Sequence, residues 1–419
     1  MPYDLFDRND PAAASRQTVL HHEPSGLWLI AGHQAIRAVL TDAEQFSNST
    51  VLAPILPPPA EAGPILAGMR DVTSVVTVDP PEHTRRRAAL SDVFPHTRVT
   101  VRQRWGDMVS RRVSDLVDEF AGAATVDVAD LAARVTLPVL CDVLGLPVDD
   151  QHDLRQWTIS FTQFAWSDLD ERGRHAALEN AAAMWQYCQQ TVTTRAAAGG
   201  YGEGVVADLL RYRDRRGKPL ALDDVVGEVL NLVGAGWVTT ASAICHVIEQ
   251  ALAVPGAWAR LAVDDLYLDA LVTEALRLRP PIIGWQRYTT RAVTIGDVTI
   301  PAESRCLLLL GTANRDPKAF ADADCFNPDR PNNRRHLAFG VGARRCIGEQ
   351  LALLEITTTV RTLALRLPQL HLDQDQPLEY QRSAVLLQRR ALAATTSCPV
   401  PHGAPDAAGP SGVGPDGNG

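Results

Sequence analysis

The chain has 419 residues, of which 46% are hydrophobic and 21% charged, and its formal net charge is −9 at pH 7. This composition is typical of a globular protein with a large core, and the acidic balance argues against a nucleic-acid partner. No apolar run reaches the roughly 18 residues of a membrane helix, and the N-terminus lacks an apolar signal stretch. We therefore expect a cytoplasmic protein with no membrane anchor. Seven scattered cysteines without a C-x-x-C pair argue against a disulfide framework or a zinc site.

The first half of the chain predicts many helices and few strands. Residues Leu27–Ile30 have the pattern of a short strand, and Ala35–Leu40 that of a helix. Residues 100–200 read as several amphipathic helices with few helix breakers. In the second half, Val293–Ile300 has the alternating pattern of a hairpin. Together these patterns predict a mainly α fold with a small β region.

A helix start is predicted at Asp79-Pro80-Pro81-Glu82-His83. Asp79 can cap the helix, the prolines suit its first turn, and Glu82 favours the positive end of the dipole. His83 and Arg87 are four residues apart and therefore share one helix face. On their own, these two residues and the arginines between them could equally form a solvated basic patch.

Residues Asp223–Gln250 predict one long apolar helix, interrupted by Gly234, Ala235 and Gly236. Each glycine inside a helix costs roughly 1 kcal/mol relative to alanine, so two within three residues require a reason. After this helix, Glu274 and Arg277 stand at positions i and i+3, where they can form an ion pair. Such pairs are common on surface helices and alone carry little information.

A glycine-rich loop surrounds a single cysteine near the C-terminus. Gly340, Gly342 and Gly348 flank Cys346, and an amphipathic helical pattern follows directly. Glycine permits positive φ and close approach of the backbone to a ligand. Free amide groups and the dipole at a helix start favour a thiolate, which is a metal ligand. The structural alternative is a buried free cysteine in a tight turn.

This loop resembles the haem-binding signature of the cytochrome P-450 family, F-G-x-G-x-[HR]-x-C-x-G. The match comprises Phe339, Gly340, Gly342, Arg344, Cys346 and Gly348. The resemblance implies one triangular, mainly α domain over residues 1–398 that holds haem b, with Cys346 as the iron ligand. The Pro/Gly-rich residues 399–419 would form a disordered tail.

Other segments extend the resemblance to the haem propionates and to the proximal side. His83 and Arg87 match the family's D-P-P-E-H-x-x-x-R segment, and Arg287 and Arg344 match further propionate ligands. Glu274, Arg277 and Arg330 resemble the family's E-x-x-R helix and its third partner. A buried cluster of these three residues would have a structural role and would hold the proximal side rigid.

Residues Gly234–Thr240 resemble the family's A-G-x-[ED]-T segment. The resemblance implies that Ala235 and Gly236 border the haem and that Thr239 is the distal catalytic group. It also implies substrate contacts for four residues: Asn231, Gly234, Ala235 and Ile283. Asn231 could orient a polar substrate group, or it could be an exposed or backbone-bonded asparagine.

One position departs from the family pattern, because Val238 replaces the carboxylate that normally relays protons. Valine cannot titrate, so the usual route of protons to dioxygen is in doubt. Water or a substrate group could carry them, the reaction could need fewer protons, or the haem could bind without turnover.

The leading functional hypothesis is a monooxygenase that hydroxylates a small natural-product-like molecule in secondary metabolism. The alternatives are oxidative coupling of an aromatic metabolite or peptide, which Val238 favours, and a non-catalytic haem sensor. No fused flavin or ferredoxin domain is recognisable, so we expect electrons from NAD(P)H through a separate ferredoxin and ferredoxin reductase, or else peroxide as the oxidant. Arg334, Arg335 and Arg345 could steer that partner or form a solvated face. We expect a monomer.

Overall fold

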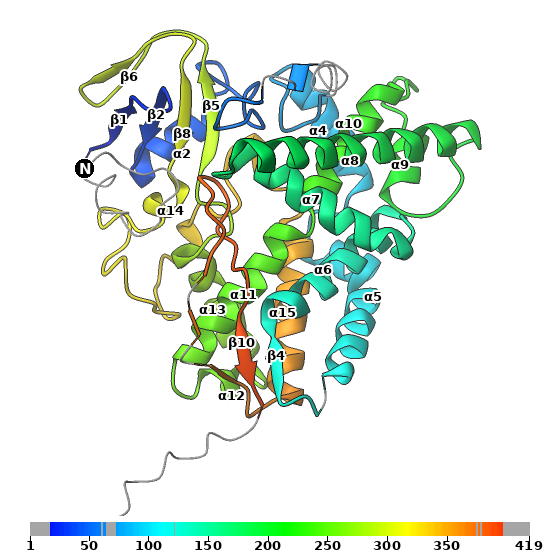
Figure 1. Ribbon diagram of the computed structural model, residues 1–419, viewed down its shortest axis with the longest axis vertical. Helices are drawn as coiled ribbons and strands as arrows, with labels where there is room; N and C mark the ends of the chain where they lie inside the picture. The colour runs from blue at the N-terminus through cyan, green and yellow to red at the C-terminus, as the bar shows by residue number, and fades with distance from the viewer. Residues whose placement is uncertain are drawn as a thin grey trace, which may run out of the picture.

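Two apolar helices form a large part of the core, α10 (Leu222–Ala235) and α11 (Val238–Ala253). In Figure 1, α11 lies near the centre of the molecule and α10 lies beside α4 and α8. Gly236 and Trp237 belong to neither helix, so the single helix predicted here is broken at this point. A Cβ at Gly236 would lie 2.5 Å from Leu140 Cδ1 and 2.7 Å from Leu232 O, which only glycine avoids. Residues Leu222–Ala253 are also long and apolar enough to cross a membrane, but 78% of the most apolar stretch is buried in the fold. The two helices of this segment therefore belong to the core of the fold.

The computed structural model describes residues 17–59, 62–63, 73–120, 122–373, 376–377 and 379–396. The tail predicted at residues 399–419 lies outside this range. Six helices pack around or beside the central pair in the main core, and α15 runs next to α11 (Figure 1). They are α5 (Arg98–Glu119), α6 (Val128–Leu144), α9 (Val205–Arg211), α12 (Ala257–Leu261), α13 (Asp265–Leu278) and α15 (Glu349–Arg366).

Two further helices pack against each other and against α10, the helix that precedes the break at Gly236 and Trp237. The pair consists of α7 (Gln151–Trp166), preceded by the 3₁₀ turn Val148–Asp150, and α8 (Glu171–Ala197). Gly145 ends α6 with φ +75°, and a Cβ there would lie 2.0 Å from Glu203 O, so the chain can turn toward this pair only at a glycine.

Five short strands form the larger sheet, in the order β1-β2-β8-β5-β3, with β2 and β8 parallel and the other neighbours antiparallel. The strands are β1 (Val19–His22), β2 (Leu27–Ile30), β3 (Phe46–Ser47), β5 (Trp285–Thr289) and β8 (Arg305–Leu308). Strand β2 has the predicted bounds. Ile30 and Leu308 face α2 (His33–Thr41), whereas Leu29 and Leu307 face Trp166 at the end of α7. The sheet is thus covered by a helix on each face.

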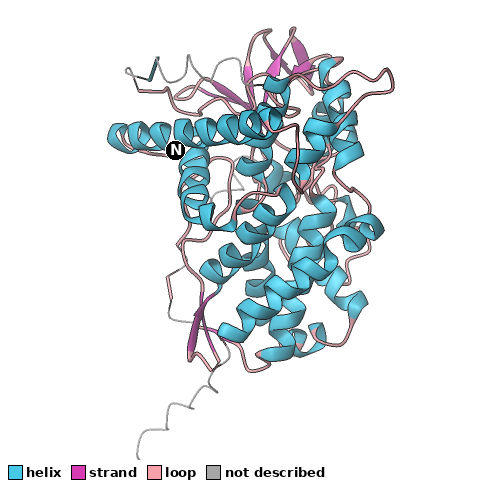
Figure 2. Cartoon of the chain, turned by 90° about the vertical axis from the view of Figure 1, so that its right-hand side faces the viewer, coloured by secondary structure: helices cyan, strands magenta, loops and turns pink. Residues whose placement is uncertain are grey.

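Two smaller sheets complete the fold, as Figure 2 shows in magenta. One is the predicted hairpin, β6 (Val293–Ile295) and β7 (Val298–Ile300), and the other joins β4 (Thr125–Asp127), β10 (Ala393–Thr395) and β9 (His371–Leu372). The remaining elements are α4 (Glu82–Val93), α14 (Leu310–Ala313) and the 3₁₀ turns Asn333–Arg335 and Gly342–Arg344. The fold is mainly α with a small β region, as predicted.

Candidate functional site

The loop that carries Cys346 connects the last 3₁₀ turn to α15. Gly340 and Gly342 have φ of +67° and +70°, a conformation that other residues adopt only with strain. A Cβ at Gly342 would also lie 3.3 Å from Thr41 Cγ2, at the end of α2. The Cys346 N–H donates to Phe339 O over 2.9 Å and closes the loop. The glycines of the predicted pattern therefore allow the backbone conformation that the loop adopts around the cysteine.

The Cys346 sulfur is surrounded by protein atoms and is nevertheless accessible to solvent. Burial raises the pKa of its thiol, and the charge of Glu349 adds to this effect. The N–H of Gly348 and the cations Arg87 and Arg345 act in the opposite direction. The residue keeps accessible surface despite this dense surrounding, and we infer from this an internal space beside its side chain. Coordination to a metal would deprotonate the thiol outright.

Electrostatic interactions link four basic side chains in a series that leads to this sulfur: Arg287 interacts with Arg344, Arg344 with His83, His83 with Arg87, and Arg87 with Cys346. Burial and the charges of Arg344 and Arg87 lower the pKa of His83 to about 4. Burial and Arg344 lower the pKa of Arg287 to about 9. These shifts arise because the cations lack enough negative charge nearby.

The carboxylates of the chain do not balance this group of cations. Arg344 donates to Asp79 Oδ1 over 2.8 Å, whereas neither Arg87 nor Arg287 forms an ion pair with any residue that the structure describes. Arg287 Nη1 donates only to Gln286 O, over 2.8 Å. A buried, uncompensated cation is costly unless a ligand supplies the counter-charge. Two ligand carboxylates, such as the propionates of haem b, fit this need.

Asp79 does not cap α4, contrary to the prediction. The helix begins after Pro81 without a side-chain cap. Instead, Asp79 accepts hydrogen bonds from the Ser47 hydroxyl, the Asn48 N–H and Arg344. The carboxylate therefore links the end of β3 to the Cys346 loop, an arrangement that no local sequence pattern indicates.

The alternative of a solvated basic patch around His83 is also wrong. His83 and Arg86 are only 4% and 5% exposed. Arg86 turns toward α10, where Nη2 donates to Asp224 Oδ1 over 2.6 Å, and Arg85 pairs with Asp224 as well. Arg87 alone of the three arginines is near enough to Cys346 to affect its pKa.

Residues on one face of the central helices line the internal space. Asn231, Ala235 and Thr239 recur every four residues, and all three keep accessible surface although the helices form the core. Ala235 is exposed, and the Thr239 hydroxyl donates to Ala235 O over 3.1 Å. Gly234 lies against Phe161, and a Cβ there would be in ordinary contact, 3.4 Å from Phe161 Cε1. Val238, in contrast, is 1% exposed.

Ile283 lies two residues before the start of β5. Its N–H donates to Val385 O over 2.7 Å, and its carbonyl accepts from the Gly311 N–H over 3.0 Å. The residue is half-buried beside Gly311, whose Cβ would lie 3.3 Å from Ile283 Cβ. These contacts hold Ile283 between Val385 and α14, and its predicted contact with substrate stays a prediction.

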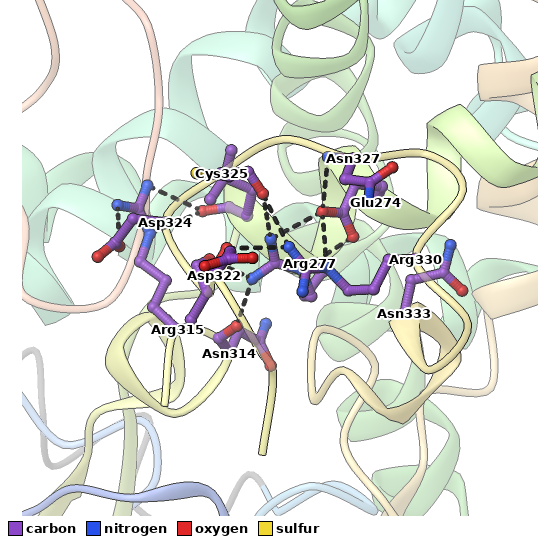
Figure 3. A network of polar contacts seen from close by, with 12 residues as sticks. Glu274, Arg277, Asn314, Arg315, Asp322, Asp324, Cys325, Asn327, Arg330 and Asn333 are labelled. Atoms are coloured by element: carbon purple, nitrogen blue, oxygen red, sulfur yellow. Dashed lines mark hydrogen bonds and ion pairs between the residues drawn. The ribbon is translucent and has the colours of Figure 1, made fainter. Parts of the chain in front are cut away.

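Figure 3 shows the cluster centred on Glu274, with its arginine partners around one carboxylate. Arg277 donates from Nε and Nη2 to the two oxygens of Glu274, each over 2.8 Å, and Arg330 Nε donates over 3.1 Å. Arg277 Nη1 donates to Asn314 O, while Asn314 Oδ1 accepts from the Leu337 N–H at the start of the Cys346 loop. The buried cluster thus supports the loop from behind.

A solvent-accessible cysteine sulfur beside unneutralised cations, with an accessible helix face in the interior, defines a haem-thiolate oxidoreductase. The sequence profile described as Cytochrome P450 matches residues 264–393. The cytochrome P450 monooxygenase PikC of Streptomyces venezuelae is 31% identical over 383 residues, which cover 89% of this chain and 85% of PikC. The 6-deoxyerythronolide B hydroxylase of Saccharopolyspora erythraea is 30% identical, with 86% and 88% coverage.

The solved structure of cytochrome P450 CREJ with (4-ethylphenyl) dihydrogen phosphate superimposes with a TM-score of 0.86. It is 27% identical, and the match covers 94% of this chain and 98% of CREJ. The chain belongs to the cytochrome P450 family. It is a P450-type oxidoreductase whose cofactor is haem b, and the residues around Cys346 fit that group.

Proposed function

We propose that the protein is a monooxygenase that hydroxylates a small natural-product-like molecule in secondary metabolism. The observation that carries this proposal is the Cys346 sulfur, which faces an internal space next to cations that lack counter-charges. The names of PikC and of 6-deoxyerythronolide B hydroxylase, a monooxygenase and a hydroxylase, support the reaction type. When bound, the haem supplies the reductive activation of dioxygen.

The residues around the internal space divide into three proposed roles. Cys346 ligates the iron, and His83, Arg87, Arg287 and Arg344 neutralise the propionates. A second group packs against the macrocycle without charge: Ala235, Gly236, Phe339, Gly340, Gly342 and Gly348. A third group, Asn231, Gly234, Ala235 and Ile283, contacts the substrate.

Thr239 is the proposed catalytic residue on the distal side. Its hydroxyl donates to Ala235 O within the same accessible helix face. A hydroxyl can accept a second hydrogen bond while it donates one, so Thr239 can hold a proton-bearing group at this face. Val238 offers no such group, because it is apolar and buried.

Electrons come, in this proposal, from NAD(P)H through a ferredoxin reductase and a ferredoxin. Arg334 and Arg335 are exposed on the 3₁₀ turn before the Cys346 loop, whereas Arg345 is held by Glu349 over 2.5 and 2.6 Å. The first two arginines are therefore the better candidates to attract an acidic ferredoxin. We further propose that the protein acts as a cytoplasmic monomer.

Oxidative coupling of an aromatic metabolite or peptide is the second candidate. It is kept because Val238 replaces the usual carboxylate, and because coupling joins two substrate centres with loss of two hydrogen atoms that leave as water. The third candidate, a non-catalytic sensor, would turn over no substrate.

Product analysis with a surrogate ferredoxin pair separates the three candidates. Compounds that shift the haem spectrum are incubated with NAD(P)H under ¹⁸O₂. We expect a product heavier by one labelled oxygen atom. A coupled product without the label would favour the second candidate, and no dioxygen-dependent product from any spectrally bound compound would contradict catalysis. The Thr239→Ala variant is the matched control for the distal role.

A further inference from the structure

A pocket of about 260 Å³ lies apart from the haem site, where three helices meet the C-terminal segment 381–390. The helices contribute the first turns of α6, the middle of α7, and the start of α11 with the break before it. Among the residues that the structure describes, its lining includes none of the Cys346 loop and none of Asn231, Ala235 and Thr239. The proposed function therefore leaves this pocket unexplained.

The buried polar atoms of the pocket that lack a partner are mostly hydrogen-bond donors. Trp237 is 1% exposed and Arg389 3%, yet Trp237 Nε1 and Arg389 Nη1 have no hydrogen-bond partner in the part of the chain that the structure describes. Glu249 pairs with Arg389 Nη2 over 2.7 Å, which leaves Nη1 without a contact. One acceptor is in the same state, Gln388 Oε1. Burial without a partner is unfavourable, so these atoms need a partner inside the pocket.

The two carboxylates that line the pocket already have partners. Asp127 Oδ1 accepts from two backbone N–H groups, and Asp130 Oδ1 accepts from Arg155 Nη1 over 2.9 Å. Arg390, in contrast, is exposed, and its side chain forms no ion pair with any described residue. A ligand with one negative charge and more than one acceptor atom matches these groups, and a carboxylate has both.

The helices also give the pocket an apolar part, which is lined by Ala129, Ala133, Ile159 and Ala241. About eight or nine waters of roughly 30 Å³ would fill the volume, but those beside the alanines and Ile159 would lack polar partners. An apolar group that displaces such waters gains affinity. The volume lies just below the roughly 300–1,000 Å³ of sites for drug-sized ligands, so a ligand of about ten non-hydrogen atoms fits.

We propose that this pocket is a second ligand site, which binds a small carboxylate with an aromatic or aliphatic body. The carboxylate accepts hydrogen bonds from Arg389 Nη1 and Trp237 Nε1 and neutralises Arg390. The body packs against Ile159 and the alanines, and Gln388 Oε1 accepts from a water that stays in the pocket. The site is separate from the haem, so the inference does not depend on the proposed monooxygenase function.

The test uses 4-fluorobenzoate as the probe and the haem-loaded protein in its reduced, carbon monoxide-bound form. Tryptophan is labelled with ¹⁵N in the indole ring, and Trp237→Phe assigns the Trp237 signal. We expect 4-fluorobenzoate to shift that signal, to broaden its own ¹⁹F resonance, and to bind with a dissociation constant on the order of 1 mM, as suits a ligand of this size. The uncharged 4-fluorobenzyl alcohol should bind at least about tenfold more weakly. No shift at Trp237, or equal binding of the alcohol, would overturn the proposal.

Variants locate the bound probe. Ala241→Leu fills the apolar part of the pocket and should abolish the binding, and Arg390→Gln should weaken it by about tenfold because one charge-assisted contact is lost. Arg216→Gln is the matched control, because it removes the same charge from an exposed residue that does not line the pocket. Undiminished binding to Ala241→Leu, or equal effects of the two arginine substitutions, would place the probe elsewhere and refute the site. Either result leaves the proposed function standing.

Discussion

Two groups of buried cations differ in how their charges are balanced. Around Glu274, Arg277 and Arg330 share one carboxylate and several backbone carbonyls, so the charges are satisfied within the chain. Around Cys346, Arg87 and Arg287 have no ion-pair partner among the described residues, and their pKa values are lowered by burial. The first group is therefore structural, whereas the second is built to receive an anionic ligand.

Removing the shared carboxylate should have the largest effect. Glu274→Gln would leave two buried arginines without a counter-charge, and we expect the free energy of unfolding to fall by about 3–5 kcal/mol. Urea denaturation followed by circular dichroism measures the change. Asp269→Asn on the same helix is the control, because its pair with Arg98 is exposed and should contribute less than about 1 kcal/mol. Similar losses in both variants would contradict the structural role of the cluster.

Removing an unbalanced cation should instead weaken cofactor binding. Arg287→Met eliminates a buried charge that no carboxylate pairs with, so we expect the stability of the haem-free chain to be kept or raised. Haem loss to an acceptor globin should accelerate by about tenfold, because one charge-assisted hydrogen bond is lost. Arg305→Met serves as the comparison: its guanidinium donates to Pro54 O and Gln286 Oε1, each over 2.7 Å. That variant should lose stability and retain haem.

A further effect is the pH dependence at His83. Its pKa is lowered from 6.5 to about 4, so between these values the unfolded chain binds more protons than the folded one. The stabilisation is complete above pH 6.5 and is lost as the pH falls toward 4. We expect the unfolding free energy of the haem-free protein to decline over this range, and His83→Gln to flatten the decline. Bound haem should also reduce it, since propionates favour the charged imidazole.

The sequence predicts the parts of the site that depend on local backbone geometry. Gly340 and Gly342 can be predicted because residues other than glycine rarely adopt positive φ. His83 and Arg87 can be predicted to share a helix face because they are four residues apart. Strand β2 and the β6–β7 hairpin follow from alternation and turn residues. The central helix is predicted with an interruption at Gly234, Ala235 and Gly236, and its break falls at Gly236 and Trp237. At Gly236, Leu140 approaches from α6 and leaves no room for a side chain.

Features that depend on contacts between distant segments are not readable from the sequence. Asp79 joins Ser47 and Arg344, which are 32 and 265 residues away along the chain. Its proximity to a helix start suggests a cap, and tertiary contacts determine its actual partners. A pocket of about 260 Å³ that Trp237 borders is likewise assembled from segments between Asp127 and Arg390, so no single motif indicates it.

The carbon monoxide spectrum of the reduced protein tests the central claim most directly. If Cys346 ligates the iron of haem b as a thiolate, reduction and addition of carbon monoxide should give the red-shifted Soret band of a thiolate ligand. Cys346→Ser should abolish this band and leave the fold intact. A haem-loaded wild-type protein without the red-shifted band, or a variant that retains it, would contradict the account.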